Sequence, residues 1–280
     1  MAGTLYVVAT PIGNLADITQ RAIQVLKDVD LIACEDTRHT RKLLQHFGIN
    51  TKTVSYHEHN EDTRSKALIE QLTEGRNIAV VSDAGTPNIS DPGFRIVNAA
   101  LEKEILVVSV PGPSALITAL TVSGLPTDEF FFAGFLPGRS TARQTRLHEL
   151  NHIPGTLIFY EAPHRLAATL KDAREILGER HAVVARELTK LHEDIRRGRL
   201  GDLARHYSDI ENPRGEIVVL IDRTRLDKDS AISVRAIDSL VTQYELQGLD
   251  HRAALKKAAR ELGISRAEAY RQLLAERARS

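Results

Sequence analysis

The chain has 280 residues, of which 42% are hydrophobic and 26% are charged, proportions typical of a globular protein of two or three domains. Its 37 basic and 37 acidic side chains cancel, so overall charge indicates no particular partner. The single cysteine, Cys34, excludes an internal disulfide framework and favours a reducing compartment. The first residues lack the basic and apolar regions of a cleaved signal, so we expect a cytoplasmic protein.

In chain order, short runs rich in β-branched residues predict eight strands, at residues 4–9, 29–34, 78–82, 105–110, 130–133, 156–160, 181–186 and 216–222. Apolar residues at helical spacing predict the intervening helices, at residues 17–27, 37–47, 60–74, 91–103, 114–123 and 163–177. Alternating strands and helices are typical of βαβ units and a largely parallel sheet.

These elements predict an α/β fold with two α/β domains, whose sheets are mostly parallel or mixed, and a small helical C-terminal domain. We place the domains at residues 1–113, 114–226 and 232–280, with a polar linker over 223–231. Residues 105–127 carry no charge, but Pro111, Gly112 and Pro113 interrupt them long before the ~20 residues of a membrane-spanning helix. We therefore expect no membrane association.

Four of the predicted strands run directly into turns rich in Pro, Gly and small polar residues. These stretches are Leu5–Asn14, Ile78–Gly93, Ile105–Ala115 and Leu157–Arg165. In open α/β sheets, ligands bind at the carboxyl ends of the strands, and small residues let the backbone approach a ligand closely. The sequence therefore predicts a small-molecule cleft at this edge.

The individual turns differ in how strongly they indicate a site. The first, T-P-I-G-N, keeps only Gly13 of a G-x-G-x-x-G fingerprint, which argues against a dinucleotide site and leaves a tight turn and a functional loop equally supported. The turn over residues 83–93 has more Gly, Pro, Ser and Asp than folding requires, so function is favoured there. Within it, we expect Asp91 and Pro92 to begin the next helix. The P-G-P-S-A turn (Pro111–Ala115) is compatible with a helix start alone.

Charged residues cluster beside three of the predicted strands, in A-C-E-D-T-R-H-T-R (33–41), G-R-S-T-A-R-Q-T-R (138–146) and R-E-L-T-K-L-H-E-D (186–194). In a helix, Glu187, Lys190 and Glu193 of the third segment would share one face. Arginines in such segments can bind phosphates, although a solvated ion-pair surface is the usual alternative. His57 and His59 lack nearby partners for a metal site, and Cys34 fits a buried strand.

The C-terminal tail is basic, with eight Lys or Arg against three Glu over residues 251–280. Asp250 is suited to cap a helix that ends near Gly263, and Ser265 with Glu268 predicts the start of another. Such a charge asymmetry indicates nucleic acid as a partner. The tail also has the spacing of a helix-turn-helix, which leaves open a non-enzymatic DNA-binding regulator.

Six motifs occur in an order that resembles the tetrapyrrole (corrin/porphyrin) methylase superfamily, and more closely its ribosomal RNA branch. They are V-A-T-P-I-G-N-L-A-D-I-T, A-C-E-D-T-R, V-S-D-A-G-T-P-x-I-S-D-P-G, V-P-G-P-S-A, F-Y-E-A-P-H-R and A-R-E-L-T-K-x-H-E. The resemblance covers residues 4 to about 222. The porphyrin-modifying members differ: they have a glycine-rich first loop where this chain has Thr10–Gly13, and an acidic G-D-P turn where it has Gly85, Thr86 and Pro87.

The resemblance implies two α/β domains that hold S-adenosylmethionine between them, a homodimer, and 2′-O-methylation of a cytidine ribose in 16S ribosomal RNA of the small subunit, without a metal. A tetrapyrrole substrate is the alternative. The expected cofactor-binding residues are Pro11, Ile12, Gly13, Asp83, Gly85, Thr86, Pro87, Ser90, Ser114, Ala115, Tyr160, Gly215, Glu216 and Ile217. The candidate catalytic residues are Asp36, Glu187 and Lys190. The expected RNA-binding residues, besides the tail, are Arg38, Arg41, Arg139, Arg143 and Arg196.

Overall fold

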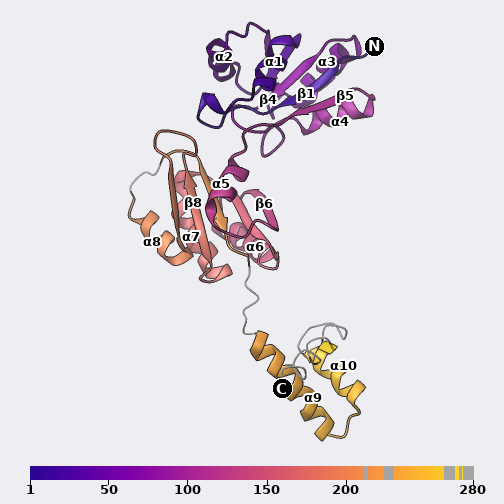
Figure 1. Cartoon of the computed structure of the whole chain (residues 1–280), viewed down its shortest axis with the longest axis vertical. Coiled ribbons are helices and arrows are strands. Elements are labelled where there is room, and N and C mark those ends of the chain that lie inside the picture. Colours follow the sequence, from indigo (N-terminus) through magenta and orange to yellow (C-terminus); the bar gives the residue numbers. More distant parts are fainter. Residues whose placement is uncertain (211–213, 224–229, 262–268, 271–272, 274–280) are drawn as a thin grey trace. The chain divides into compact units, whose positions relative to one another are not determined.

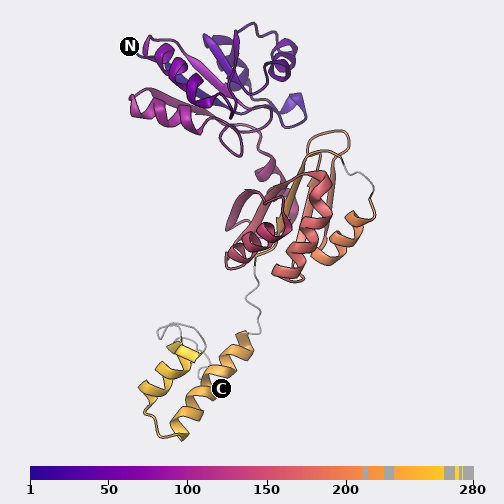
Figure 2. The same cartoon turned by 180° about the vertical axis from the view of Figure 1, so that it is seen from behind.

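The computed structural model describes residues 1–210, 214–223, 230–261, 269–270 and 273, with residues 230–236 described in backbone only. The chain divides into two compact units, Met1–Arg223 and Thr224–Ser280, which are described separately (Figures 1 and 2). The first unit contains two five-stranded sheets and the second contains helices.

The first sheet is parallel throughout, with the strand order β3-β2-β4-β1-β5. Its strands are β1 (Thr4–Val8), β2 (Leu31–Cys34), β3 (Thr53–Ser55), β4 (Ile78–Val81) and β5 (Leu106–Val110). The helices that follow them are α1 (Gln20–Asp28), α2 (Thr37–His46), α3 (Glu61–Thr73) and α4 (Phe94–Glu102), with the short 3-10 helix η1 (Leu15–Asp17) before α1.

Alternation along the buried strands divides the core of this sheet into two layers. Ala79 and Val81 of β4 pack with α1 and α2, whereas Ile78 and Val80 pack with α3 and α4. Successive side chains of a strand point to opposite faces, so a continuous apolar run is what a sheet covered on both sides requires. The first sheet is therefore doubly wound. Its helices cover the two faces, so the loops after the strands lie at the ends of the sheet.

The second sheet is mixed, with the order β6-β7-β10-β8-β9, and only β6 and β7 are parallel. Its strands are β6 (Phe130–Phe135), β7 (Thr156–Glu161), β8 (His181–Arg186), β9 (Asp194–Arg199) and β10 (Ile217–Ile221). Its helices are α5 (Ala115–Ser123), α6 (Ser140–Leu150), η2 (Pro163–Arg165), α7 (Leu166–Leu177) and α8 (Leu200–Ser208).

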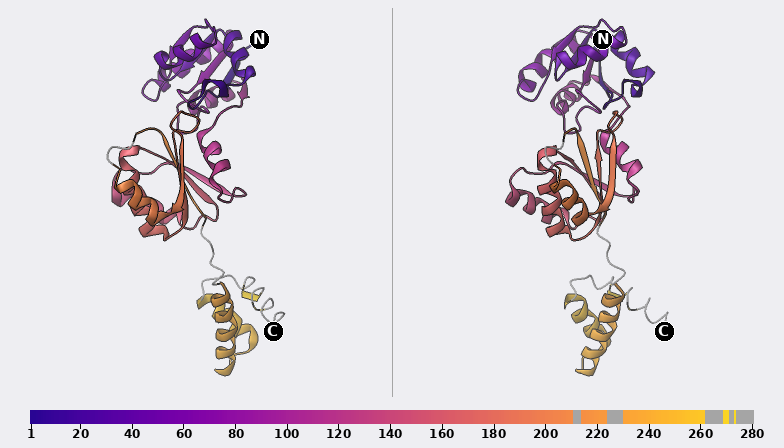
Figure 3. Two further views of the ribbon diagram at one scale, coloured as in Figure 1. Left: turned by 60° about the vertical axis from the view of Figure 1, so that its left-hand side comes forward. Right: turned by 90° about the vertical axis from the view of Figure 1, so that its left-hand side faces the viewer.

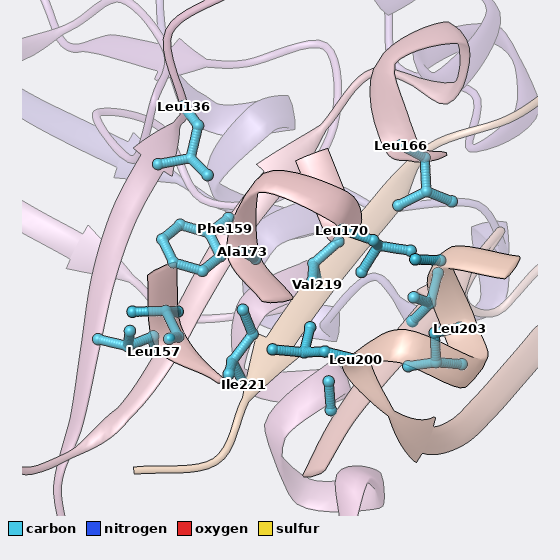
Figure 4. Close-up of a cluster of buried hydrophobic side chains, with 14 of the residues drawn as sticks. Leu136, Leu157, Phe159, Leu166, Leu170, Ala173, Leu200, Leu203, Val219 and Ile221 are labelled. Carbon is cyan, nitrogen blue, oxygen red and sulfur yellow. The ribbon is translucent and has the colours of Figure 1, made fainter. Parts of the chain in front are cut away.

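Helices α6, α7 and α8 cover one face of this sheet and α5 covers the other (Figure 3). Side chains of the central strand β10 again alternate between the two faces of the sheet. Val219 and Ile221 belong to the larger of its two apolar clusters, shown in Figure 4, whereas Val218 and Leu220 pack with α5. The α5 layer also includes Ile12 from the turn after β1 and Leu188 from the turn after β8. Residues from both sheets thus share one apolar cluster at the strand ends.

The predicted fold class is confirmed, and the eight predicted strands lie within two residues of their observed bounds. The structure differs locally from the prediction. Strands β3 and β9 were not predicted, and α4 begins at Phe94 with Gly93 as its cap, so Asp91 and Pro92 precede the helix. The charged segment after β8 is a turn rather than a helix, because it joins the antiparallel strands β8 and β9. The proposed domain boundaries at 113 and 226 stay predictions.

The second unit contains α9 (Ser230–Leu246) and α10 (His251–Glu261), which pack through Val241, Tyr244, Leu255 and other apolar residues. The prediction for Asp250 is confirmed, since its Oδ1 accepts the Ala253 N–H at 2.8 Å. Gly263, Ser265 and Glu268, and most of the expected linker, lie outside the described residues. Across the described residues, none of the helices has the length and apolar character needed to cross a membrane.

Candidate functional site

The turns after β1, β4 and β5 are bound to one another by hydrogen bonds. Thr10 and Gly85 exchange two backbone hydrogen bonds of 2.9 and 3.1 Å, and Thr86 Oγ1 donates to the Pro113 carbonyl at 3.1 Å. Gly85 has φ of +84°, and a Cβ there would lie 3.3 Å from Cγ2 of Ile12. Glycine is therefore favoured at this position by conformation and by space. The three turns form one preorganised wall.

The second sheet supplies the opposite wall through an antiparallel strand. Ile217, at the amino end of β10, pairs with Glu161 at the carboxyl end of β7 and with Arg186 at that of β8. Gly215, just before β10, has φ of +98°, and a Cβ there would lie 2.5 Å from Cγ of Glu187. The start of β10 is thus held closely against the turn after β8.

Between these walls lies a cavity of about 360 Å³, a size that suits a small cofactor. Main-chain turns from both sheets and a few apolar and acidic side chains line it. The lining residues are Ile12, Asp83, Ala84, Gly85, Thr86, Ile89, Ser90, Asp91, Ser114, Ala115, Phe135, Tyr160, Glu161, Ala162, Pro163, Leu188, Gly215, Glu216, Ile217 and Val218.

The cavity is acidic: four carboxylates line it, and the described lining contains no Lys, Arg or His. Glu161 is neutralised by Arg165, whose Nη2 lies 2.6 Å from its Oε1. Asp83 accepts the Asp36 N–H at 3.0 Å. Burial, followed by the charge of Glu35, raises the pKa of Asp91 to about 6. Since a raised carboxyl pKa marks a site where negative charge is poorly compensated, the cavity favours a cationic ligand.

Of the fourteen residues predicted to bind the cofactor, eleven line this cavity and three do not. Pro11 and Pro87 lie in its turns without lining it, and Gly13 faces the turn after β8, where a Cβ would lie 2.4 Å from Lys190 Cγ. The cofactor role of all fourteen stays a prediction.

Sequence reasoning missed nine of the lining residues: Ala84, Ile89, Asp91, Phe135, Glu161, Ala162, Pro163, Leu188 and Val218. Most of them lie inside motifs that had been recognised, so the quoted motifs themselves were the available signal. Phe135 and Val218 lie outside those motifs and had no such signal.

Glu187 and Lys190 are brought together by the turn after β8, in which Glu187 and Thr189 have positive φ of 53° and 66°. Lys190 Nζ donates to Glu187 at 2.8 Å and to Glu216 at 3.0 Å, and Glu216 lines the cavity. The Lys190 hydrogen bond lowers the pKa of Glu187. Burial lowers the pKa of Lys190, but its two carboxylate partners outweigh this and raise it. The cluster therefore holds an ammonium between carboxylates.

Asp36 has different neighbours from this cluster. Its carboxylate caps α2 by accepting the Arg38 N–H at 2.8 Å, and it forms an ion pair of 2.8 Å with the Arg38 guanidinium. Those hydrogen bonds hold the pKa of Asp36 well below its usual range. Its link to the cavity is the backbone N–H that it donates to Asp83.

Four of the five arginines expected to bind RNA have exposed side chains, namely Arg38, Arg41, Arg139 and Arg196. Arg143 is only 3% exposed, and its guanidinium lies 2.6 Å from Asp172. It also donates to the Gly138 carbonyl at 3.1 Å. Because Arg143 is buried in an ion pair, it is not available to a phosphate, and we remove it from the RNA-binding set. The described residues also contain no cluster of His, Cys, Asp and Glu that could hold a metal ion.

The family model of the Tetrapyrrole (Corrin/Porphyrin) Methylases matches residues 4–204, and the chain belongs to this family. It is therefore a methyltransferase. A "Ribosomal RNA small subunit methyltransferase I" from Xylella fastidiosa is 50% identical, over 96% of this chain and 98% of the relative. A protein of the same name from Pseudomonas aeruginosa is 46% identical, over 100% and 99%. These relatives span both units of the chain.

Among solved structures, a uroporphyrin-III C-methyl transferase from Thermus thermophilus, complexed with S-adenyl homocysteine, has a TM-score of 0.55. Its sequence is 18% identical, and the match covers 78% of this chain and 97% of that one. At this identity the likeness concerns the fold alone.

We predict that Arg143→Ala lowers the free energy of unfolding by about 3 kcal/mol, because it leaves the Asp172 carboxylate buried without its cation. Arg139→Ala, an exposed site on the same segment, should change it by less than about 0.5 kcal/mol. Urea denaturation followed by circular dichroism measures both values. Equal, small losses in the two variants would contradict the structural role assigned to Arg143.

Proposed function

We propose that the protein transfers a methyl group from S-adenosylmethionine to the ribose 2′-oxygen of a cytidine in 16S ribosomal RNA, within the small subunit and in the cytoplasm. The observation that carries the proposal is an acidic cavity of cofactor size, built from the turns that resemble the ribosomal RNA branch of the family. The names and near-complete coverage of the relatives support the same substrate class.

The residues present fit this cofactor. When bound, S-adenosylmethionine supplies a methyl group on a positively charged sulfonium, ready for in-line displacement. The carboxylates of Asp83, Asp91 and Glu216 complement that charge, and the backbone of the Gly85 and Gly215 turns can approach the ligand closely. Hydrogen bonds within these turns fix the positions of the lining groups before the cofactor binds. This reduces the entropic cost of aligning the cofactor for methyl transfer.

We predict that affinity for S-adenosylmethionine weakens about fourfold between pH 7.0 and pH 5.5, because Asp91, with a pKa of about 6, becomes mostly protonated over that range. Asp91→Asn should bind more weakly at pH 7.0 and lose most of this pH dependence. Isothermal titration calorimetry at both values is the measurement. Asp17→Asn, an exposed acid in η1, is the matched control. An unchanged pH dependence in Asp91→Asn would refute the role of this carboxylate.

For the chemical step, the cluster of Glu187, Lys190 and Glu216 offers a hydrogen-bond acceptor and a cation beside the cavity. An ionised Glu187 can accept the ribose hydroxyl proton, and the Lys190 ammonium can stabilise the negative charge that develops on the 2′-oxygen. With its raised pKa, Lys190 acts as a cation rather than as a neutral base. Asp36 remains a candidate through its hydrogen bond to Asp83.

We expect Lys190→Met and Glu187→Gln each to lower kcat by about 100-fold, the usual loss when one proton acceptor or oxyanion donor is removed. Dissociation constants for S-adenosylmethionine should stay within about twofold, since these side chains do not line the cavity. Lys171→Met, an exposed lysine on α7, is the control. Full turnover in Lys190→Met, Glu187→Gln and Asp36→Asn alike would remove the catalytic assignment.

RNA phosphates would bind outside the cavity, at the exposed Arg38, Arg41, Arg139 and Arg196 and at the basic tail. We also propose a homodimer. Exposed apolar side chains on the edge strand β5 and on α5 are the candidate contacts of its interface, because subunit interfaces cover apolar surface. These residues are Leu106, Ile117 and Val122.

The deciding experiment is methylation of purified small ribosomal subunits, and separately of bare 16S RNA, by the pure protein with labelled S-adenosylmethionine. We expect one cytidine nucleoside to gain a methyl group, and the linkage after it to resist alkaline hydrolysis because its 2′-hydroxyl is blocked. Methylation on the base would leave that linkage alkali-sensitive. Transfer to a tetrapyrrole, with none to either RNA, would overturn the proposal.

A further inference from the structure

An exposed phenylalanine, Phe135, lies at the cavity and is not used by the chemistry described above. It is 57% exposed, although phenylalanine is normally buried, and it lines the cavity together with Tyr160. Among the described lining residues these two are the aromatic side chains. An aromatic ring that is exposed at the edge of a binding cavity is available to stack against a ligand.

The backbone of β6 is shaped to bring this ring to the cavity. Phe132 pairs with Ile158 and Phe135 pairs with Tyr160, so three steps along β6 match two steps along β7. The extra residue is accommodated by a bulge in which Gly134 has φ of +63°. Without the bulge, the alternation of the strand would turn residue 135 to the opposite face of the sheet. The bulge thus places Phe135 on the same face as Phe132 and Tyr160.

Neighbouring side chains hold the ring in place. The Phe135 and Tyr160 rings meet edge to face with centroids 5.7 Å apart, and Phe132 contacts Tyr160 in the same manner at 4.8 Å. A Cβ at Gly134 would lie 3.4 Å from Ser90 Oγ, so the bulge lies against the loop after β4. That loop contributes Ile89, another apolar lining residue, whose exposure is 38%. Phe135 and Ile89 therefore give the rim of the cavity an apolar part, which lies on the same lining as the exposed carboxylate of Glu216.

We propose that Phe135 is the stacking platform for the nucleobase of the nucleotide that is methylated, with Ile89 as a second apolar contact. This inference rests on the proposed function. To reach a methyl donor inside the cavity, a ribose 2′-oxygen must leave its helical stack, and its base then needs a new stacking surface. An exposed, braced aromatic ring supplies that surface for single-stranded RNA.

The adenine of S-adenosylmethionine is the competing ligand for this ring. The exposure of Phe135 favours the incoming base, because an adenine enclosed by the cofactor turns would be expected to cover side chains that are already recessed, such as the half-buried Tyr160. The two assignments predict different losses on substitution. If the ring stacks on the RNA base, its removal lowers RNA turnover and leaves cofactor binding unchanged. If the ring stacks on the adenine, its removal weakens cofactor binding.

The test compares Phe135→Ala, Phe135→Leu and Phe135→Tyr in the full chain. We expect Phe135→Ala and Phe135→Leu to lower kcat/KM for RNA by about 10-fold or more, as loss of a base–aromatic stack does, and Phe135→Tyr to retain activity. The dissociation constant for S-adenosylmethionine, measured by calorimetry, should stay within about twofold in all three. Phe131→Ala, an exposed phenylalanine of β6 that does not line the cavity, should behave as wild type.

A spectroscopic readout complements the kinetics. RNA carrying a fluorescent cytidine analogue at the methylated position should be quenched on binding wild type and Phe135→Tyr, but not on binding Phe135→Ala. If Phe135→Ala weakens cofactor binding as much as RNA turnover, or if Phe135→Leu matches wild type, the platform assignment is overturned. Wild-type methylation in the same assay tests the proposed function separately: a wild type that methylates RNA, alongside an equally active Phe135→Ala, defeats only this inference.

Discussion

The cavity depends on the pair of backbone hydrogen bonds between Thr10 and Gly85. These bonds extend the contact between β1 and β4 beyond the end of the sheet, and the Thr86 hydroxyl then attaches the turn after β5 to the same scaffold. One wall of the cavity is therefore built from turns whose backbone positions are fixed by these hydrogen bonds. A side chain at Gly85 would meet Ile12.

The second sheet also brings backbone groups to the cavity, but it does so through an antiparallel strand. A parallel sheet presents only carboxyl ends at one edge, whereas antiparallel β10 brings its amino end between the carboxyl ends of β7 and β8. The Glu187 N–H donates to the Glu216 carbonyl at 2.9 Å there, and the Glu187 carboxylate accepts the Glu216 N–H at 3.0 Å. The acidic partners of Lys190 are thus placed by strand pairing, although they are 29 residues apart along the chain.

Much of the fold could be predicted from the sequence, because apolar runs ended by Gly and Pro mark buried strands and their turns without reference to distant residues. β9 could not, since its D-I-R-R-G-R sequence has the polar character of an edge strand. Nor could the start of α4, where Glu61 from another helix accepts the Gly93 N–H at 2.9 Å instead of a local cap. Arg143 was misjudged and Phe135 was missed because both depend on residues distant in the sequence. The burial of Arg143 depends on Asp172, and the exposure of Phe135 depends on a bulge set by β7.

Under the proposed function, the distribution of charge limits which part of an RNA can enter the cavity. The described lining of the cavity is acidic and carries no basic side chain, so a phosphate inside it would lie among carboxylates in a region of reduced dielectric. The exposed arginines lie on the surface instead, where they can hold the RNA backbone. A nucleotide can satisfy both conditions only if its phosphates stay outside while its sugar turns inward. In the proposed complex, the uncharged base would then lie on the apolar part of the rim, at Phe135 and Ile89.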